Sequence, residues 1–221
     1  RSVELVPIAG GQVGPAASLP IGPLRLAAIA DDEKRLRDTI DRHLDELPWL
    51  DGRSFNAFYA VGGAWRALAR IHMEQNGYPL HVIQQYTLSR GAAEDFLDLV
   101  AHQSRKSLEK IPAVSRKRLE TVPFAARVLH RLVKRTQPKR LIFSAYGLRE
   151  GHLYSLLSEK EQQQDPLLAG AAALAQSHRR FGADGDELFA WAHPLYPNEQ
   201  PEQGRLRHAA SLLSDVAWAE H

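Results

Sequence analysis

A short apolar run that ends in two glycines constrains this chain more than any other feature. Residues 55–61 have the sequence FNAFYAV, and Gly62 and Gly63 follow at once. A nearly continuous apolar run is typical of a central strand that is buried on both faces of a sheet. The residues from Ala64 to Gly77 have the pattern of a helix. The segment therefore predicts a strand, a glycine turn and a helix, as in an α/β fold.

The other elements of the first 158 residues follow from similar patterns. Residues 2–8 and 16–26 predict two strands of a hairpin around a turn at 9–12. Residues 32–47 place leucine and isoleucine on one stripe of an amphipathic helix. We also expect a strand near 80–88, a helix from Ser89 to about His102, a helix in the latter part of 105–140, a strand at 140–145, and a turn at 146–151 that leads into a helix.

The sequence changes character after residue 158. Residues 159–166 (EKEQQQDP) are polar and break the periodicity. Beyond them the patterns are helical, over 166–181, 185–192 and 205–220. In the last of these helices Leu206, Ala209, Ala210, Leu213, Val216 and Ala217 form the expected buried stripe. We therefore expect an α/β domain over residues 1–158 and the beginning of an all-α domain over 159–221.

Composition excludes several classes of protein. The chain has 221 residues, of which 44% are hydrophobic and 24% charged, so a disordered or fibrous chain is excluded. It has no cysteine, which excludes disulfides and cysteine nucleophiles and fits the cytoplasm. No segment approaches the ~20 apolar residues of a membrane helix, so we expect no membrane partner. No signal peptide is visible. Because the only methionine is Met73, and the chain starts inside an expected strand and stops inside an expected helix, we expect a fragment of a longer protein.

Positive charge is concentrated in one segment. The whole chain has a net charge of +2, but residues 105–140 carry twelve Lys or Arg against two Glu, hence +10. Such a segment attracts polyanions or forms a solvated helix face without a ligand, and the residues alone leave both open. Phe124 is the only aromatic residue among these basic residues, so a base-stacking nucleic-acid platform is disfavoured.

The glycine pair also has two interpretations. A helix N-terminus presents free N–H groups and the positive end of its dipole, and glycine lets an anion approach them closely. Strand, glycine pair and helix therefore suit a phosphate site, and they equally suit a tight turn with no ligand.

Four motifs carry a resemblance to a known family. They are SVEL at residues 2–5, SLPIG at 18–22 with Arg25 after it, AVGG at 60–63 with Arg66 after it, and YGLREG at 146–151. In this order and spacing they resemble the exopolyphosphatase / guanosine pentaphosphate phosphohydrolase family, over essentially the whole chain. The tail from His208 to Trp218 is similar to the helical domain that follows in that family.

The resemblance implies a fold and an activity. The fold is the actin-like, sugar-kinase-like one, with two ribonuclease H-like halves around a phosphate cleft. Residues 1–158 look like the second half, and 159–221 like the start of the helical, HD-like domain. The implied activity is hydrolysis of terminal phosphoanhydride bonds of inorganic polyphosphate, or of guanosine pentaphosphate, with Mg²⁺. In the family the catalytic base lies in the other half, so we expect it upstream of Arg1 and expect this chain alone to be inactive.

The resemblance also implies site residues. Ser2 and the backbone N–H groups of Gly62 and Gly63 would hold phosphate, and Arg66 would clamp an anion unless it is an ordinary surface arginine. Arg25 is a further phosphate-binding candidate. Glu4 would assist the metal, directly or through water, unless it is merely a solvent-facing strand residue. Arg1 stands where the family has a third glycine, whereas Arg149 and Glu150 are expected to pair or to hold their turn.

The basic segment acquires a specific interpretation from this resemblance. A polyphosphate chain that extends beyond the cleft would be retained by a basic track on a neighbouring helix, and salt would weaken that retention. Arg127, Arg131, Lys134 and Arg135 are the expected track.

The tail departs from the metal-binding pattern of the family's helical domain. The sequence contains no His-Asp dipeptide, since Ser214 precedes Asp215. We therefore expect no metal site there and a packing or substrate-guiding role. Two other classes remain open, an actin-like kinase or ATPase and a non-catalytic module that binds polyphosphate or senses guanosine tetraphosphate. We expect a homodimer only by analogy with other two-part enzymes.

Overall fold

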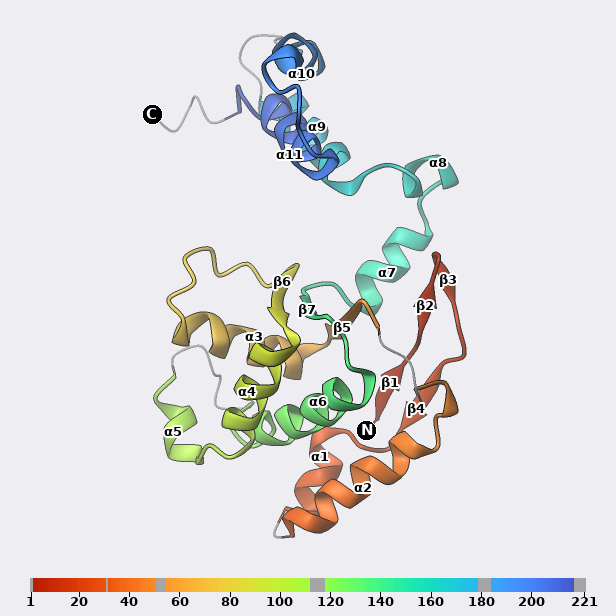
Figure 1. Cartoon of the computed structure of the whole chain (residues 1–221), viewed down its shortest axis with the longest axis vertical. Helices are drawn as coiled ribbons and strands as arrows, with labels where there is room; N and C mark the ends of the chain where they lie inside the picture. Colours follow the sequence, from red (N-terminus) through yellow and green to blue (C-terminus); the bar gives the residue numbers. More distant parts are fainter. Residues whose placement is uncertain (1, 31, 51–54, 112–117, 179–183, 217–221) are drawn as a thin grey trace. The chain divides into compact units, whose positions relative to one another are not determined.

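The structure, a computed structural model, describes the chain except residues 1, 31, 51–54, 112–117, 179–183 and 217–221. It forms two units, Arg1–Gly151 and His152–His221 (Figure 1). The division falls within helix α7 (Leu148–Ser155), a few residues before the change in sequence character at 158. The larger unit combines strands and helices, whereas the described part of the smaller unit is helical.

Two short antiparallel ladders open the larger unit. Strand β1 (Val3–Leu5) pairs with β4 (Ala17–Leu19), with Glu4 opposite Ser18. Between them β2 (Ile8–Ala9) and β3 (Gln12–Val13) form a separate two-residue ladder around Gly10 and Gly11. Both glycines have positive φ, which a tight hairpin turn requires.

A three-stranded mixed sheet forms the second part of this unit. Strand β7 (Arg140–Ser144) lies in the centre, parallel to β5 (Ala57–Val61) and antiparallel to β6 (Tyr86–Ser89). Leu141, Ile142 and Phe143 of β7 are buried. The parallel pair brings the carboxyl ends of β5 and β7 to the same edge of the sheet.

Helix α6 (Val122–Thr136) connects the two parts. Its buried residues recur at helical spacing, and it contacts four helices, namely α1 (Pro23–Leu26), α2 (Glu33–Asp45), α3 (Gly63–Gln75) and α4 (Arg90–Ala101). Val128 and Leu132 belong to the core around β1 and β4, while Leu129 and Val133 belong to the core around β5–β7. One helix therefore contributes to both hydrophobic cores.

Several sequence-based predictions are confirmed and others need correction. Ser89 caps α4, because its side chain accepts a hydrogen bond from the Ala92 N–H. The predicted strand 16–26 is wrong in its second half, where Pro23–Leu26 forms helix α1 with proline in its first turn. The strand expected near 80–88 forms only at the end of that range, where β6 spans Tyr86–Ser89. Strand β5 forms as predicted but lies at the edge of its sheet, not in the centre.

The smaller unit is built from short helices. They are α8 (Glu159–Gln162), α9 (Pro166–His178), α10 (Gly185–Ala192) and α11 (Pro201–Leu212), and α11 contacts both α9 and α10. Ala209 is buried as expected, but Leu206 is 59% exposed and Ala210 is also exposed, so the expected buried stripe is wrong. Helix α11 ends at Leu212, whereas the sequence predicted a helix to residue 220, whose last four residues lie outside the described part of the chain. Short helices α5 (Arg105–Glu109), η1 (Ala27–Ile29), η2 (Pro48–Leu50) and η4 (His193–Leu195) complete the described elements.

Candidate functional site

A carboxylate flanked by two hydroxyls lies on the first ladder. Glu4 Oε1 accepts hydrogen bonds from Ser2 Oγ at 2.6 Å and from Ser18 Oγ at 2.8 Å. These donors stabilise the ionised form, so the Ser2 hydroxyl first and the Ser18 hydroxyl second lower the pKa of the Glu4 carboxyl. All three side chains are exposed. The ladder thus presents a fixed, ionised carboxylate to an approaching ligand.

A cavity connects this carboxylate to the second sheet. It measures about 460 Å³ and is lined on one side by residues 4–8 and on the other by β5. Trp49, Trp65 and Thr136 also line it. Val61, which lines it too, is the residue immediately before Gly62. Glu4 and the end of β5 therefore face one continuous space.

The glycine pair forms the N-terminus of helix α3. Gly62 is the N-cap with φ 121° and ψ 160°, a conformation almost restricted to glycine. Its carbonyl accepts the first helical hydrogen bond, from the Arg66 N–H at 3.0 Å. Gly63 begins the helix, whose first N–H groups have no partner within the helix. The loop thus offers donors and a positive dipole end at the carboxyl edge of the sheet.

Arg66 ties this helix start to the neighbouring strand. Its Nη1 donates to the Ala145 carbonyl at 2.8 Å, just beyond the end of β7. Gln84 fixes the same loop, since its Oε1 accepts from the Ala145 N–H at 2.8 Å. Arg66 is half-buried, and its role in binding an anion stays a prediction. The bond to Ala145 uses one of five guanidinium N–H groups.

Arg118 places a second guanidinium at the glycine pair. A Cβ atom added to Gly63 would lie 2.5 Å from Arg118 Nη2, so this side chain rests directly against Gly63. Glycine at position 63 therefore leaves the room that the guanidinium fills. The Arg118 guanidinium and the positive end of the helix dipole repel each other, and an anion bound between them would turn this repulsion into two attractions.

Glu150 and Arg25 behave differently from these residues. Glu150 Oε2 accepts from the Gly147 N–H at 2.7 Å, so it holds the turn after β7, as expected. Backbone N–H groups, its own first and that of Gly147 next, lower the pKa of Glu150. Arg25 is exposed on α1, a helix that contacts α6. Among the described contacts none joins Arg25 to the other candidate residues. Arg1 lies outside the described residues.

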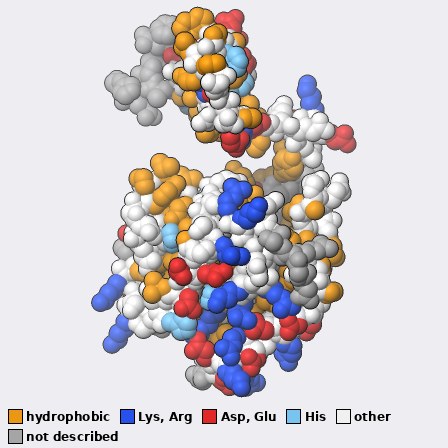
Figure 2. Space-filling model, viewed as in Figure 1, with side chains coloured by type: hydrophobic (Ala, Val, Ile, Leu, Met, Phe, Trp, Pro, Cys, Tyr) orange, Lys and Arg blue, Asp and Glu red, His pale blue; other side chains and the backbone are white. Residues whose placement is uncertain are grey.

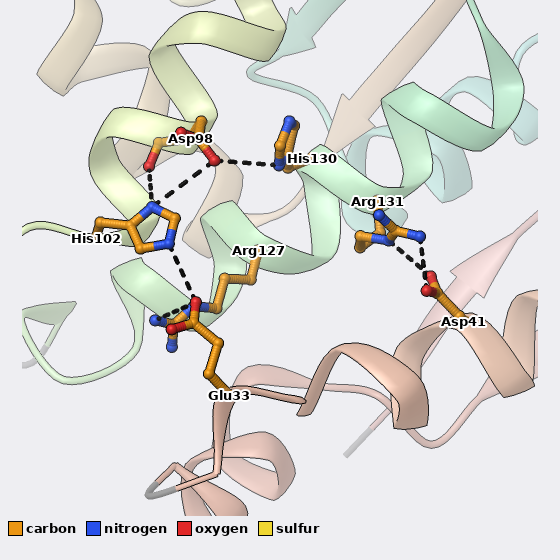
Figure 3. A network of polar contacts seen from close by, with 7 residues as sticks. All are labelled: Glu33, Asp41, Asp98, His102, Arg127, His130 and Arg131. Atoms are coloured by element: carbon orange, nitrogen blue, oxygen red, sulfur yellow. Dashed lines mark hydrogen bonds and ion pairs between the residues drawn. The ribbon is translucent and has the colours of Figure 1, made fainter. Parts of the chain in front are cut away.

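Three members of the expected polyphosphate track are paired with acidic residues of α2. Arg131 donates to both oxygens of Asp41 at 2.6 Å, from Nε and Nη2 (Figure 3). Arg127 Nη2 lies 3.4 Å from Glu33 Oε1, and Arg135 Nη2 lies 2.9 Å from Asp45 Oδ1. The pairs join two packed helices and neutralise charge that the sequence places in a basic block.

The surface around these pairs is of mixed charge. His102 Nε2 also reaches Glu33 Oε1, at 3.1 Å, and His130 Nδ1 lies 3.9 Å from Asp98 Oδ1 (Figure 3). In Figure 2 blue and red side chains alternate over the lower half of the larger unit. Lys134 is exposed. The polyphosphate track stays a prediction, and the structure gives three of its four residues a role in helix packing.

Histidines of the smaller unit make packing contacts. His208 Nε2 lies 2.6 Å from Asp186 Oδ1, and its ring stacks on Phe189 with centroids 4.4 Å apart. Arg207 lies over the same Phe189 ring and bonds Glu199 at 2.8 Å. No group of three or more His, Asp or Glu side chains that could hold a metal ion occurs among the described residues. Within that same part of the chain, no helix is long and apolar enough to cross a membrane.

Sequence reasoning missed two residues of the site. Arg118 is one of twelve basic residues in its segment, and nothing in the sequence distinguishes it from the others. Gln84 lies in a segment without a motif, and only the structure places it under the loop after β7. Both act across long sequence separations, which local patterns do not report.

Comparisons with known proteins identify the family and the fold. Residues 1–160 match the model of the Ppx/GppA phosphatase family. The structure is similar to that of an Aquifex aeolicus Ppx/GppA phosphatase, with TM-score 0.59 and 22% identity over 71% of this chain and 54% of that one. It is also similar to an exopolyphosphatase from Cytophaga hutchinsonii, with TM-score 0.57 and 19% identity over 70% of this chain and 53% of that one. No curated protein sequence matches this chain.

These comparisons determine the fold and the family. The chain spans about half the length of the solved structures that it matches. It has their actin-like, sugar-kinase-like fold followed by a helical segment. Because the family model covers well over half of its residues, this chain belongs to the Ppx/GppA phosphatase family.

Proposed function

We propose that this chain is part of a phosphatase that hydrolyses the terminal phosphoanhydride bond of inorganic polyphosphate and releases orthophosphate. Guanosine pentaphosphate is the alternative substrate. Family membership supports the reaction class. The observation that carries the proposal is the ionised Glu4, held by two hydroxyls, on a cavity that extends to the strand end before Gly62.

The glycine pair and two guanidinium groups are the proposed phosphate-binding group. Free N–H groups at the start of α3 would donate to phosphate oxygens, and Arg66 and Arg118 would balance their charge. Arg66 is preorganised for this task, because its bond to the Ala145 carbonyl fixes the guanidinium at the carboxyl edge of the sheet. Ser2 adds a hydroxyl beside Glu4.

The donor set at Glu4 fits Mg²⁺. Mg²⁺ prefers oxygen ligands and is commonly bound by one or two carboxylates together with water and substrate phosphates. Glu4 supplies an ionised carboxylate, and the hydroxyls of Ser2 and Ser18 hold it in place. Bound Mg²⁺ would neutralise the charge of the phosphate oxygens. Glu4 would hold the ion directly or through water.

The base that activates water is proposed to lie outside this chain. Hydrolysis needs a carboxylate poised to take the proton of the attacking water. Glu4 is committed to two hydroxyl donors and has a lowered pKa, so it is a poor proton acceptor. We therefore expect this chain alone to bind phosphate groups without turning them over.

A chimera tests this proposal. The part of the Aquifex aeolicus phosphatase that this chain does not cover would be joined to Arg1, and orthophosphate release from long-chain polyphosphate with Mg²⁺ would be measured. We expect the chimera to be active, the chain alone to be inactive, and Glu4→Gln to reduce release at least tenfold. Glu46→Gln, on an exposed residue after α2, is the matched control. Activity of the chain alone would refute the assignment of the base, and equal rates for Glu4→Gln and Glu46→Gln would refute the role of Glu4.

A further inference from the structure

Gln84 lies in a turn whose backbone is strained. The Tyr86 N–H donates to the Ile83 carbonyl at 3.0 Å, which closes a four-residue turn at the start of β6. Gln85, the third residue of this turn, has a φ of 65°, in the left-handed region that favours glycine. Such strain persists only where the surrounding structure fixes it. Ile83 and Tyr86 are both buried in the core around β5–β7, so the turn gives Gln84 one fixed position.

The side chain of Gln84 reaches from this turn to the loop after β7. Its Oε1 accepts hydrogen bonds from the Ala145 N–H at 2.8 Å and from Ser144 Oγ at 3.3 Å. Because a backbone N–H can only donate, the oxygen of the amide and not its nitrogen must face the loop. The turn is also attached to β7 itself, since the Gln85 N–H donates to the Phe143 carbonyl at 3.0 Å. Gln84 is therefore held against the loop from two sides.

Ala145 connects Gln84 to Arg66. The Ala145 N–H donates to Gln84, and the Ala145 carbonyl accepts from Arg66 Nη1 at 2.8 Å. Each residue has only two soft backbone dihedrals, so bonds at both backbone groups of Ala145 give its carbonyl one direction. Among the hydrogen bonds of the described residues, this carbonyl is the one acceptor of the Arg66 side chain. The direction of the Arg66 guanidinium therefore depends on a carbonyl that Gln84 holds in place.

A carboxylate near Arg66 makes this fixed direction important. Glu150 belongs to the same loop, where its Oε2 accepts from the Gly147 N–H. Backbone N–H groups lower the pKa of Glu150 most, and the charges of Arg149 and Arg66 lower it further. Among the described residues Arg66 and Glu150 nevertheless form no ion pair, because the Arg66 guanidinium is bound to Ala145. A guanidinium released from that carbonyl would turn toward the carboxylate, which would neutralise its charge.

We propose that Gln84 is a positioning residue, which holds the Arg66 guanidinium in the direction in which it binds a phosphate group of the substrate. Gln84 acts through the two backbone groups of Ala145 and does not touch the substrate. This inference rests on the proposed function, since Arg66 belongs to the proposed phosphate-binding group. The strain at Gln85 fits the role, because strained backbone is found where a site requires a geometry that relaxed backbone would not hold.

An isosteric substitution tests the proposal. Gln84→Met removes the acceptor oxygen and keeps an unbranched side chain of similar length. The full 221-residue chain would be titrated with inorganic tripolyphosphate in the presence of Mg²⁺, and NMR shifts of the Gly62 and Gly63 amides would give the dissociation constant. The same samples give the hydrogen exchange of the Ala145 N–H and the rate at which the Arg66 guanidinium rotates about its Nε–Cζ bond.

Three measured values should change in Gln84→Met. We expect at least tenfold faster exchange at Ala145, at least fivefold faster rotation of Arg66 and an at least fivefold higher dissociation constant. In a chain that already carries Arg66→Met, Gln84→Met should raise the constant less than twofold, because no guanidinium is left to position.

Two further variants separate the side chain of Gln84 from its turn. Gln85→Gly relaxes the strained φ and keeps the Gln84 side chain, so this matched control should change none of the three values more than twofold. Gln84→Glu keeps an acceptor oxygen, so exchange at Ala145 and rotation of Arg66 should both stay slow.

Three results would overturn the proposal. The first is an unchanged dissociation constant and unchanged Arg66 rotation in Gln84→Met, although exchange at Ala145 becomes faster. The second is a further fivefold loss of affinity in the Arg66→Met background, since Gln84 would then act through the fold and not through Arg66. The third is fast rotation of Arg66 in Gln84→Glu, which retains the acceptor.

Failure of the proposed function gives a different result. If the parent chain does not bind tripolyphosphate, the proposed phosphate-binding group is refuted. The rotation of Arg66 then decides the positioning by itself, because it is measured without a ligand. Faster rotation in Gln84→Met but not in Gln85→Gly would support the role of Gln84, and equal rotation in all three chains would overturn it.

Discussion

Replacing Gly62 by alanine tests the conformation on which the phosphate loop depends. At φ 121° and ψ 160° a side chain strains the backbone by about 1–3 kcal/mol. A Cβ at this position would meet nothing within 4 Å, so no packing clash adds to that strain. Alanine also stabilises by restricting the unfolded chain, by about 0.4–1 kcal/mol. The net expectation is a loss of about 1–2 kcal/mol in the free energy of unfolding.

The matched control is Gly91→Ala. Gly91 lies in α4, has no positive φ, and would also place a Cβ in open space. We expect it to gain a few tenths of a kcal/mol, since alanine is the better helix former. Urea unfolding followed by circular dichroism measures both variants, with the larger unit analysed as its own transition. Equal stabilities of Gly62→Ala and the parent chain would refute the argument that the loop requires glycine.

Three further predictions concern stability. Asp41→Asn should lower the free energy of unfolding by about 1 kcal/mol in dilute buffer and by less in 1 M salt, because the bidentate bond to Arg131 is partly exposed and is screened by salt. Urea titrations at both salt concentrations measure the two losses, and a loss that does not depend on salt would contradict the prediction. The Arg205 guanidinium lowers the pKa of Asp165 from 3.8 to about 2, so the pair stabilises the folded chain above pH 4 and this stabilisation is lost as the pH falls toward 2. Asp165→Asn should therefore reduce the dependence of the free energy of unfolding on pH between 4 and 2. An unchanged pH dependence in urea titrations would contradict the role of the pair. Burial lowers the pKa of His72, so as the pH falls the unfolded chain takes up this proton at a higher pH than the folded chain does. The free energy of unfolding should therefore decrease as the pH drops through about 6.5. An NMR titration of the folded chain in which His72 has its midpoint at or above 6.5 would contradict the prediction.

Much of the fold can be predicted from local patterns, and the exceptions have identifiable causes. Helix α2 and the cap of α4 follow from apolar spacing and a serine before the first turn. The strand prediction for residues 16–26 is wrong at Pro23, because proline occurs both in edge strands and in the first turn of a helix. The apolar pattern at β5 predicted a buried central strand, but β5 is an edge strand with Tyr59 and Val61 exposed, because an apolar run does not report how many neighbours a strand has.

The site was predictable only where a motif marks it. Glu4, Ser2 and the glycine pair belong to motifs, and their geometry suits the expected chemistry. Arg118 reaches Gly63 across 55 positions of sequence, and the block around it gives no reason to choose it. Charge counting also failed to anticipate that α2 would neutralise Arg127, Arg131 and Arg135, because pairing between distant helix faces depends on packing.

The most direct test of the central claim follows oxygen from water into the product. The chimera that carries the uncovered part of the Aquifex aeolicus phosphatase would be incubated with long-chain polyphosphate and Mg²⁺ in ¹⁸O-labelled water, with no acceptor nucleotide. Mass spectrometry of the released orthophosphate would then count labelled oxygens. Hydrolysis predicts one ¹⁸O in each orthophosphate, and Glu4→Gln should slow its appearance. Orthophosphate without label, or release only when a nucleoside diphosphate or another phosphate acceptor is added, would contradict the account.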